Sequence, residues 1–312
     1  MSMKRIAWLD ILKFLAIYLV VLGHLVSTNE QPHLKGIIYS FHMPLFFIIS
    51  GFLYKEQAGY MHHVKTLMVP YILLSALYFP IYIIFHRHEN FWCDYVEQFL
   101  YGKALWFIPA LFVMKMTFVP IVHQYNMYKA IVLMIMSFIC AYIYYQYSHT
   151  FDFHIFRFFP FFIMGYIVKK EKIELLISGK ICLVSLVVYM ISVLLCGGYA
   201  ELIQFVRVDY VIHFFVQALG GIIVSTYIAQ NTLRLTRIKF VNVIAKGTIF
   251  VYAFHFAFLP LVFRIIQKID ISTLAWYYPI LQCSIALIII IFLYGPILFV
   301  MKYCPVILGK YK

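Results

Sequence analysis

Long apolar segments alternate with short polar ones along the whole chain. Ten segments approach or reach the roughly 20 apolar residues that a helix needs to cross a bilayer, so each predicts a transmembrane helix. They cover residues 6–28, 37–54, 66–85, 105–122, 130–147, 154–168, 181–195, 210–229, 247–266 and 274–301. No repeat and no Pro- or Gly-rich linker separates them, which predicts one all-α membrane domain over residues 1–312.

The composition supports a polytopic membrane protein. Of the 312 residues, 64% are hydrophobic, 20% aromatic and only 12% charged, and the mean hydropathy is +0.91. These values exclude an ordinary soluble domain. The net charge of +13 is spread over short connections, so it predicts topology and not a nucleic-acid partner. The six cysteines are scattered without a CxxC pair, and we predict neither a disulfide framework nor a metal site.

Lys and Arg are distributed unequally between the two sides of the spans. Of the 25, sixteen flank the side that carries both chain ends, six flank the other side, and Lys13, Lys115 and Arg157 lie within spans. The excess of positive charge in cytoplasmic connections predicts cytoplasmic N and C termini and a multi-pass protein of the cell inner (plasma) membrane. The first segment is long and charged, so we interpret it as a retained helix and not as a cleaved signal peptide.

The first span contains Asp10, Lys13 and His24. At about 100° per residue, Lys13 and His24 lie on almost the same line of the helix, ~16 Å apart along its axis. Asp10 lies one turn before Lys13. Charged groups within a span usually face the bundle interior or a wet cavity. We therefore predict a polar shaft with an acid–base pair at one end and a titratable imidazole near the other.

Three more polar side chains are predicted at the height of His24. With the orientation given above, His42 in the second span, Trp106 at the start of the fourth and Arg157 near the start of the sixth all fall in the outer third. This prediction concerns depth in the membrane alone and does not imply that these helices lie next to one another.

Each of these side chains has a chemical and a structural interpretation. His24 could be a general base toward a hydroxyl, which we favour, or a histidine bonded to a backbone carbonyl. His42 could react or orient a partner. Arg157 could bind an oxyanion or sugar hydroxyls, or pair with Asp152. Trp106 suits an interfacial belt first and ligand stacking second.

Other polar residues are interpreted as structural. His255, near the middle of the ninth span, is taken as structural unless its helix lines the shaft. Lys115 is taken as snorkelling or paired. The histidines at 62–63 and 86–88 stand beside span ends without further ligands at metal-like spacing, which favours solvated loops.

Several of these segments resemble a known family. The first span with WLD, IL, K and VVLGH, and FHMPLFFIISGF at 41–52, are similar to the signatures of the acyltransferase 3 family of integral membrane acyltransferases. LWFIPALF at 105–112, RFFPFFIMGY at 157–166 and VYAFHFAF at 251–258 resemble weaker segments of its sugar O-acetyltransferase branch.

The resemblance implies transfer of an acyl group, often acetyl from acetyl-CoA, to a hydroxyl of a cell-envelope glycan. It implies that His24 is catalytic and that Lys13, where the family more often has Arg, contacts the donor. We therefore predict a membrane O-acyltransferase that uses cytoplasmic acetyl-CoA (acyl-CoA) as co-substrate and an extracytoplasmic glycan or lipid-linked glycan precursor as acceptor. The site residues assigned are His24 and His42 for catalysis, Lys13 and Asp10 for the donor, and Arg157 and Trp106 for the acceptor or oxyanion.

The alternative is an exporter of polysaccharide or a small solute built on the same bundle. The inverted repeat common in transporters is not visible in the sequence, which disfavours that alternative. The remaining expected partner is membrane lipid, and homo-oligomerisation is compatible with the sequence. Basic residues of the cytoplasmic flanks could hold the phosphates of the donor, although the positive-inside bias alone explains most of them: Lys169, Lys170, Lys172, Arg234, Arg237 and Lys239.

Overall fold

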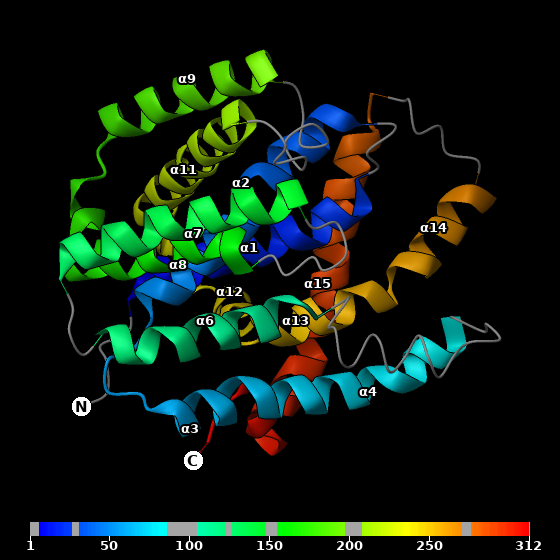
Figure 1. Ribbon diagram of the computed structural model, residues 1–312. Coiled ribbons are helices and arrows are strands. Elements are labelled where there is room, and N and C mark those ends of the chain that lie inside the picture. The colour runs from blue at the N-terminus through cyan, green and yellow to red at the C-terminus, as the bar shows by residue number, and fades with distance from the viewer. Residues whose placement is uncertain are drawn as a thin grey trace.

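The computed structural model describes residues 6–26, 31–85, 105–122, 126–147, 155–196, 208–269 and 276–311. Within these ranges the chain is helical and contains no strand (Figure 1), which confirms the predicted all-α class. The longer helices are α1 (Ala7–Leu25), α2 (Pro32–Phe52), α4 (Val69–Phe85), α6 (Phe107–Val122), α7 (Met127–Tyr147), α8 (Ile155–Lys170), α9 (Gly179–Cys196), α11 (Val208–Asn231), α14 (Leu259–Lys268) and α15 (Tyr278–Tyr303). The shorter elements are α3 (Tyr60–His63), η1 (Val64–Met68), η2 (Ile173–Leu176), η3 (Leu233–Arg237), α12 (Lys239–Lys246), α13 (Thr248–Phe254), η4 (His255–Ala257) and η5 (Pro305–Leu308).

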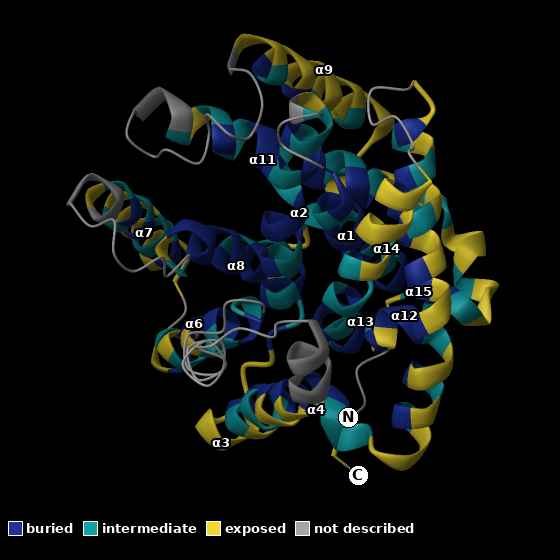
Figure 2. Cartoon of the chain, turned by 90° about the vertical axis from the view of Figure 1, so that its right-hand side faces the viewer, coloured by how far each residue is buried: buried dark blue, intermediate teal, exposed yellow. Residues whose placement is uncertain are grey.

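α1 lies in the interior of the bundle. It contacts α2, α11, α12, α13 and α15. Figure 2 shows α1, α2 and α8 largely buried, whereas α9 lies at the rim with most of its residues exposed. The polar side chains of α1 are therefore held inside the protein, as expected for charged groups within a span.

α2 and α8 pack backbone against backbone. Gly51 of α2 and Gly165 of α8 lie at the crossing. A Cβ atom at Gly51 would collide with the carbonyl oxygen of Phe162, and one at Gly165 would collide with that of Ile48. Small residues allow this close approach. In lipid, where hydrophobic burial does not drive helices together, the resulting van der Waals packing stabilises the helix pair.

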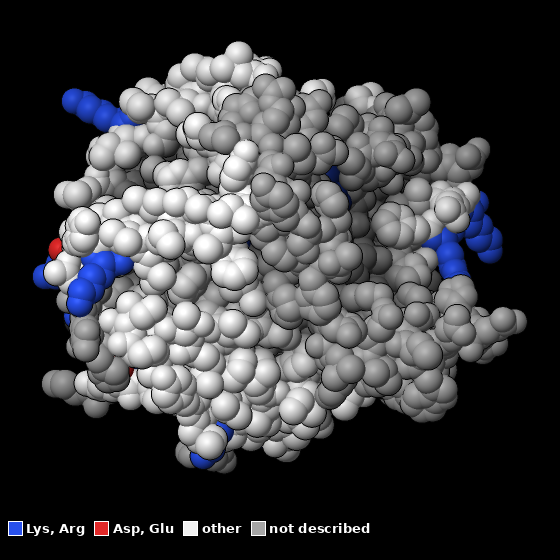
Figure 3. Space-filling view, viewed as in Figure 1, with Lys and Arg blue, Asp and Glu red and all other residues white. Residues whose placement is uncertain are grey.

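The described helices support a membrane protein. Four of them are long and apolar enough to cross a bilayer, namely Ala7–Leu25, His33–Phe52, Val211–Asn231 and Tyr278–Tyr303. Shorter apolar helices cover Phe107–Ile121, Met127–Ile143 and Gly179–Leu195. In Figure 3 the Lys and Arg side chains lie toward the edges of the molecule, and the broad described face between them is mostly uncharged. The number of ten spans stays a prediction.

The chain bends sharply at the start of the span predicted over residues 247–266 and is broken once more within that span. α12 and the following helix, Thr248–Ala257, are bent by 72° at Gly247, and together they could form a fifth crossing. A second break follows at η4, before α14. Pro260 lies in the first turn of α14 and has no N–H for a helical hydrogen bond to Phe256, which explains why the helix does not continue. His255 stands at this second break.

Candidate functional site

A cavity runs along the face of α1 on which Lys13 lies. Lys13 and Val20, seven residues apart and thus on one face of the helix, both line it. Its volume is about 160 Å³, and its polar lining comes from Lys13, Ser50, Thr248 and Tyr252. His24 lies one turn beyond Val20 on the same face. The other lining residues are apolar, and His24 is not among them, so the polar shaft from Lys13 to His24 stays a prediction.

Asp10 is buried one turn before Lys13 on α1. Burial of a carboxylate among apolar residues is costly unless a cation or hydrogen-bond donor is close. The i, i+3 spacing places Lys13 among its neighbours on the helix surface. These two residues thus mark the polar end of the α1 face.

At the other end of α1, His24 packs against the broken helix. Its ring centroid lies 5.1 Å from that of His255 and 4.5 Å from that of Phe256. Because α1 and η4 are far apart in sequence, spacing along the chain could not reveal this pair. The sequence interpretation of His255 as a structural residue therefore missed its position beside His24.

The hydrogen bonds of His255 fix its tautomer. Nδ1 lies 3.1 Å from the carbonyl oxygen of Val251 and 2.9 Å from that of Tyr252. A carbonyl oxygen only accepts, so Nδ1 carries the proton and Nε2 of the neutral ring is an acceptor. Nε2 is buried, and the described residues offer it no hydrogen-bond partner. His255 thus presents a buried lone pair beside His24.

His42 is fixed in the same way. Its Nδ1 lies 2.8 Å from the carbonyl oxygen of Ile38, so Nε2 is again the acceptor. The Tyr39 ring lies 4.7 Å from the His42 ring and 6.3 Å from the His24 ring. His42 also lies within electrostatic range of His24. The structure therefore brings His24, His42 and His255 to one region, which we call the imidazole cluster.

Lys35 ties this region together and was not among the predicted site residues. Its ammonium donates to the carbonyl oxygens of Gly23 and Val26, at 2.5 and 3.0 Å, and lies 4.1 Å from the centroid of the Tyr39 ring. A lysine at the C-terminal end of a helix satisfies carbonyls that the helix itself cannot. Lys35 thus joins the end of α1 to the start of α2 beside His24.

Arg157 and Trp106 lie in an adjoining aromatic layer. Arg157 is 1% exposed, and its guanidinium carbon is 4.4 Å from the Phe214 ring centroid and 5.4 Å from that of Phe158. Trp106 stacks on Phe158 at 5.7 Å. Asp152, the other partner considered for Arg157, lies outside the described residues.

This layer connects to the imidazole cluster through rings. Trp106 contacts Phe107, Phe107 contacts Tyr252 and Tyr252 contacts His255, with centroid distances of 6.4, 5.8 and 6.3 Å. The Phe107 amide also donates to the Tyr252 hydroxyl at 3.3 Å. Arg157 and Trp106 are therefore linked to His255 through intervening side chains.

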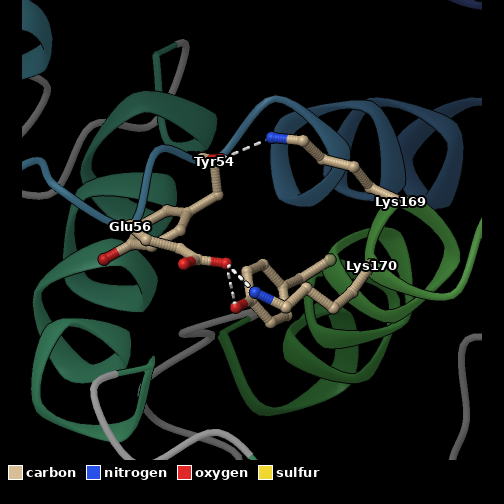
Figure 4. Close-up of polar contacts among 5 residues, drawn as sticks. Tyr54, Glu56, Lys169 and Lys170 are labelled. Atoms are coloured by element: carbon tan, nitrogen blue, oxygen red, sulfur yellow. Dashed lines mark hydrogen bonds and ion pairs between the residues drawn. The ribbon is translucent and has the colours of Figure 1, made fainter.

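The far end of α2 carries a second polar region, shown in Figure 4. Glu56 accepts hydrogen bonds from Lys170 Nζ at 2.6 Å and from the Tyr166 hydroxyl at 2.7 Å, and Lys169 Nζ donates to the Tyr54 carbonyl at 3.0 Å. The hydrogen bond from Lys170, followed by that from Tyr166, lowers the pKa of the Glu56 carboxyl below its usual value. Lys169 and Lys170, two of the predicted phosphate-binding candidates, are thus engaged by the protein itself.

Comparison with known proteins identifies one family. Residues 6–295 match the acyltransferase 3 family model, which is described as an acyltransferase domain. Among curated proteins and among solved structures, no significant match is found.

Proposed function

Because this chain belongs to the acyltransferase 3 family, we propose that it moves an acetyl or other acyl group across the membrane from acyl-CoA to a hydroxyl. The donor is cytoplasmic acetyl-CoA, and the acceptor is an extracytoplasmic glycan or its lipid-linked precursor. The observation that carries the proposal is the cavity that Lys13 and Val20 line on α1, one helical turn short of His24, which packs against His255.

The proposed topology has ten spans and cytoplasmic termini in the inner membrane. The start of α1, the end of α2 and the end of α8 then face the cytoplasm. The imidazole cluster lies toward the opposite face. A thin donor arm enters past Lys13, which contacts it, while Asp10 orients the Lys13 ammonium. The cavity volume of about 160 Å³ is small for a glycan, and its mostly apolar lining suits a donor arm better.

In the proposed reaction His24 is the general base. It takes the proton of the acceptor hydroxyl as that oxygen attacks the thioester carbonyl carbon. The carbonyl π electrons move to oxygen and form a tetrahedral oxyanion. When this intermediate collapses, the C–S bond breaks and the leaving thiolate receives the proton from the His24 imidazolium. The products are an O-acyl ester and free CoA, and His24 returns to its neutral form.

The other residues position the reactants. His42 and His255 offer Nε2 acceptors near His24 and orient the hydroxyl or the imidazolium. Arg157 supplies fixed positive charge toward the acceptor or the oxyanion. Trp106 offers an aromatic face to the acceptor.

Proteoliposomes test this proposal. Acetyl-CoA labelled in the acetyl group is supplied on the face that bears the termini, and an acceptor glycan is enclosed on the other face. We expect label on the glycan and free CoA on the donor side. Movement of unmodified glycan without thioester cleavage would instead identify an exporter. Thioester hydrolysis that depends on His24 reports the reaction in the absence of a competent acceptor.

A further inference from the structure

We propose that Tyr54, His63 and Lys115 form a binding site for a phosphate group of the acyl donor. This inference rests on the proposed function, because it assigns a part of the donor to a part of the protein. The three side chains come from the end of α2, from α3 and from α6. We call them the phosphate cluster.

Tyr54 and His63 are buried with polar atoms that lack protein partners among the described residues. Tyr54 is 1% exposed and His63 is 2% exposed. The described residues offer no hydrogen-bond partner to the Tyr54 hydroxyl or to either ring nitrogen of His63. Buried polar atoms are nearly always hydrogen-bonded, so three such atoms in one place indicate a ligand or solvent that satisfies them.

The rings that carry these atoms lie against one another. The Tyr54 and His63 rings stack with centroids 5.6 Å apart and an interplanar angle of 29°. Phe118, one turn after Lys115 on α6, packs edge-on against Tyr54 at 5.3 Å. The rings therefore hold one another in place and leave their polar atoms for a third group.

Lysine side chains make the surroundings of His63 positively charged. Lys115 lies within electrostatic range of His63, and Lys55 lies within range of Lys115. The nearby carboxylate of Glu56 is already bound by Lys170 and Tyr166. Burial, followed by the charge of Lys115, lowers the pKa of His63 to about 4, so the imidazole is neutral at pH 7 and offers a ring N–H, while Lys115 supplies the positive charge. A phosphate accepts from hydroxyl, imidazole and ammonium donors alike.

Residues next to the phosphate cluster line the cavity that contains Lys13. They are Leu53, Leu67 and Leu111. Leu53 precedes Tyr54, and Leu67 and Leu111 lie one helical turn from His63 and Lys115, respectively. The phosphate cluster therefore adjoins the cavity. A phosphate bound there would place the rest of a long donor in the cavity with its thin arm beside Lys13.

The test uses the purified full-length protein in discs of neutral lipid and calorimetry with CoA, with pantetheine and with inorganic pyrophosphate. Tyr54→Phe and His63→Phe remove the polar atoms while keeping the stacked rings, and Lys115→Met removes the charge. We expect each variant to weaken CoA binding about tenfold or more and to leave pantetheine binding unchanged, because a hydrogen bond to a charged group is being lost. Thermal unfolding should show equal or higher stability in the two Phe variants.

Matched controls are His213→Phe and Tyr128→Phe, which change the same residue types in α11 and at the start of α7. Wild-type affinity for CoA in all three cluster variants would overturn the inference and leave the proposed function intact. Absence of CoA binding to the wild-type protein would contradict the proposed donor, and the inference would fail with it. Binding to phosphatidylglycerol vesicles that depends on His63, without any effect of His63 on CoA, would assign the cluster to a lipid headgroup and also overturn it.

Discussion

The imidazole rings of His24 and His255 lie 5.1 Å apart and are tilted by 42°, although one ends a long helix and the other stands at a break in a second helix. Nδ1 of His255 is occupied by backbone carbonyls, so only Nε2 is available for chemistry. In the proposed reaction, a hydroxyl bound beside His24 would meet a second hydrogen-bond acceptor whose orientation is set by these backbone contacts.

Replacement of His24 tests the general base. We expect His24→Ala to lower acyl transfer by ~10²-fold or more, because the attacking hydroxyl loses its proton acceptor. The rate is measured as release of free CoA by purified protein, with insertion and thermal unfolding as controls for folding. Near-normal turnover would remove His24 from the reaction.

Replacement of His255 separates a structural role from a positioning role. We expect His255→Phe to lower kcat/KM by about tenfold or more, with a change in the shape of its pH profile, since Nε2 no longer holds the reactants. His255→Gln keeps a donor for the carbonyls and an acceptor, and should recover part of the rate. A lower melting temperature in both variants with an unchanged pH profile would leave His255 a purely structural role.

Lys13 is expected to contact the donor through charge. Lys13→Ala should weaken CoA binding in calorimetry, whereas Lys13→Arg should retain much of it because both side chains are cationic. Asp10→Asn should also weaken binding, because Asp10 no longer orients the ammonium. Equal CoA affinity in Lys13→Ala and wild type would return Lys13 to a structural role in the cavity.

The contact between α2 and α8 predicts a strong stability effect. Gly51→Ala places a methyl group on the Phe162 carbonyl, and the helices must separate, at a cost of ~1–3 kcal/mol or more. Gly295→Ala is the matched control, because Gly295 lies within α15 and a Cβ there meets nothing within 4 Å. Thermal unfolding in detergent should show a lower midpoint for Gly51→Ala and little change for Gly295→Ala.

Glu56 predicts a pH dependence of stability. Hydrogen bonds from Lys170 and Tyr166 lower its folded pKa below the usual 4.5, so its contribution is present above pH 4.5 and is lost as the pH falls through the folded pKa. Between pH 6 and the acid range, the free energy of unfolding should therefore fall more in the wild-type protein than in Glu56→Gln. In a Lys170→Met background, the difference that Glu56→Gln makes should be smaller. The pair is partly exposed, so the effect is expected to be small. Identical acid sensitivity in wild type and Glu56→Gln would contradict this assignment.

Local features of the sequence predicted much of the helical fold. Apolar length located α1, α2, α11 and α15, because a bilayer demands long apolar helices. Gly247 coincides with the predicted start of the ninth span, whereas the break at His255 escaped prediction because residues 248–259 stay apolar through it. Pro260 was a visible signal for the second break.

The site was predictable along one helix and unpredictable between helices. The spacing of Lys13 and His24 predicted their common face, and helical geometry makes that inference strong. Lys35 and His255 come to His24 from other helices, and such contacts depend on packing that a single sequence does not contain. Tyr54, His63 and Lys115 escaped prediction for the same reason, because three separate elements supply them.

The backbone contact at Gly51 and Gly165 has a consequence for the choice of donor. With no side chain between them to repack, α2 and α8 form a rigid pair, and α2 fixes ~15 Å between His42 and Phe52. The imidazole cluster and the phosphate cluster lie at opposite ends of this length, so, under the proposed function, α2 sets the distance between the two groups that contact the donor. A coenzyme with a long arm can reach both ends at once, whereas a short donor such as acetyl phosphate can occupy only one of them.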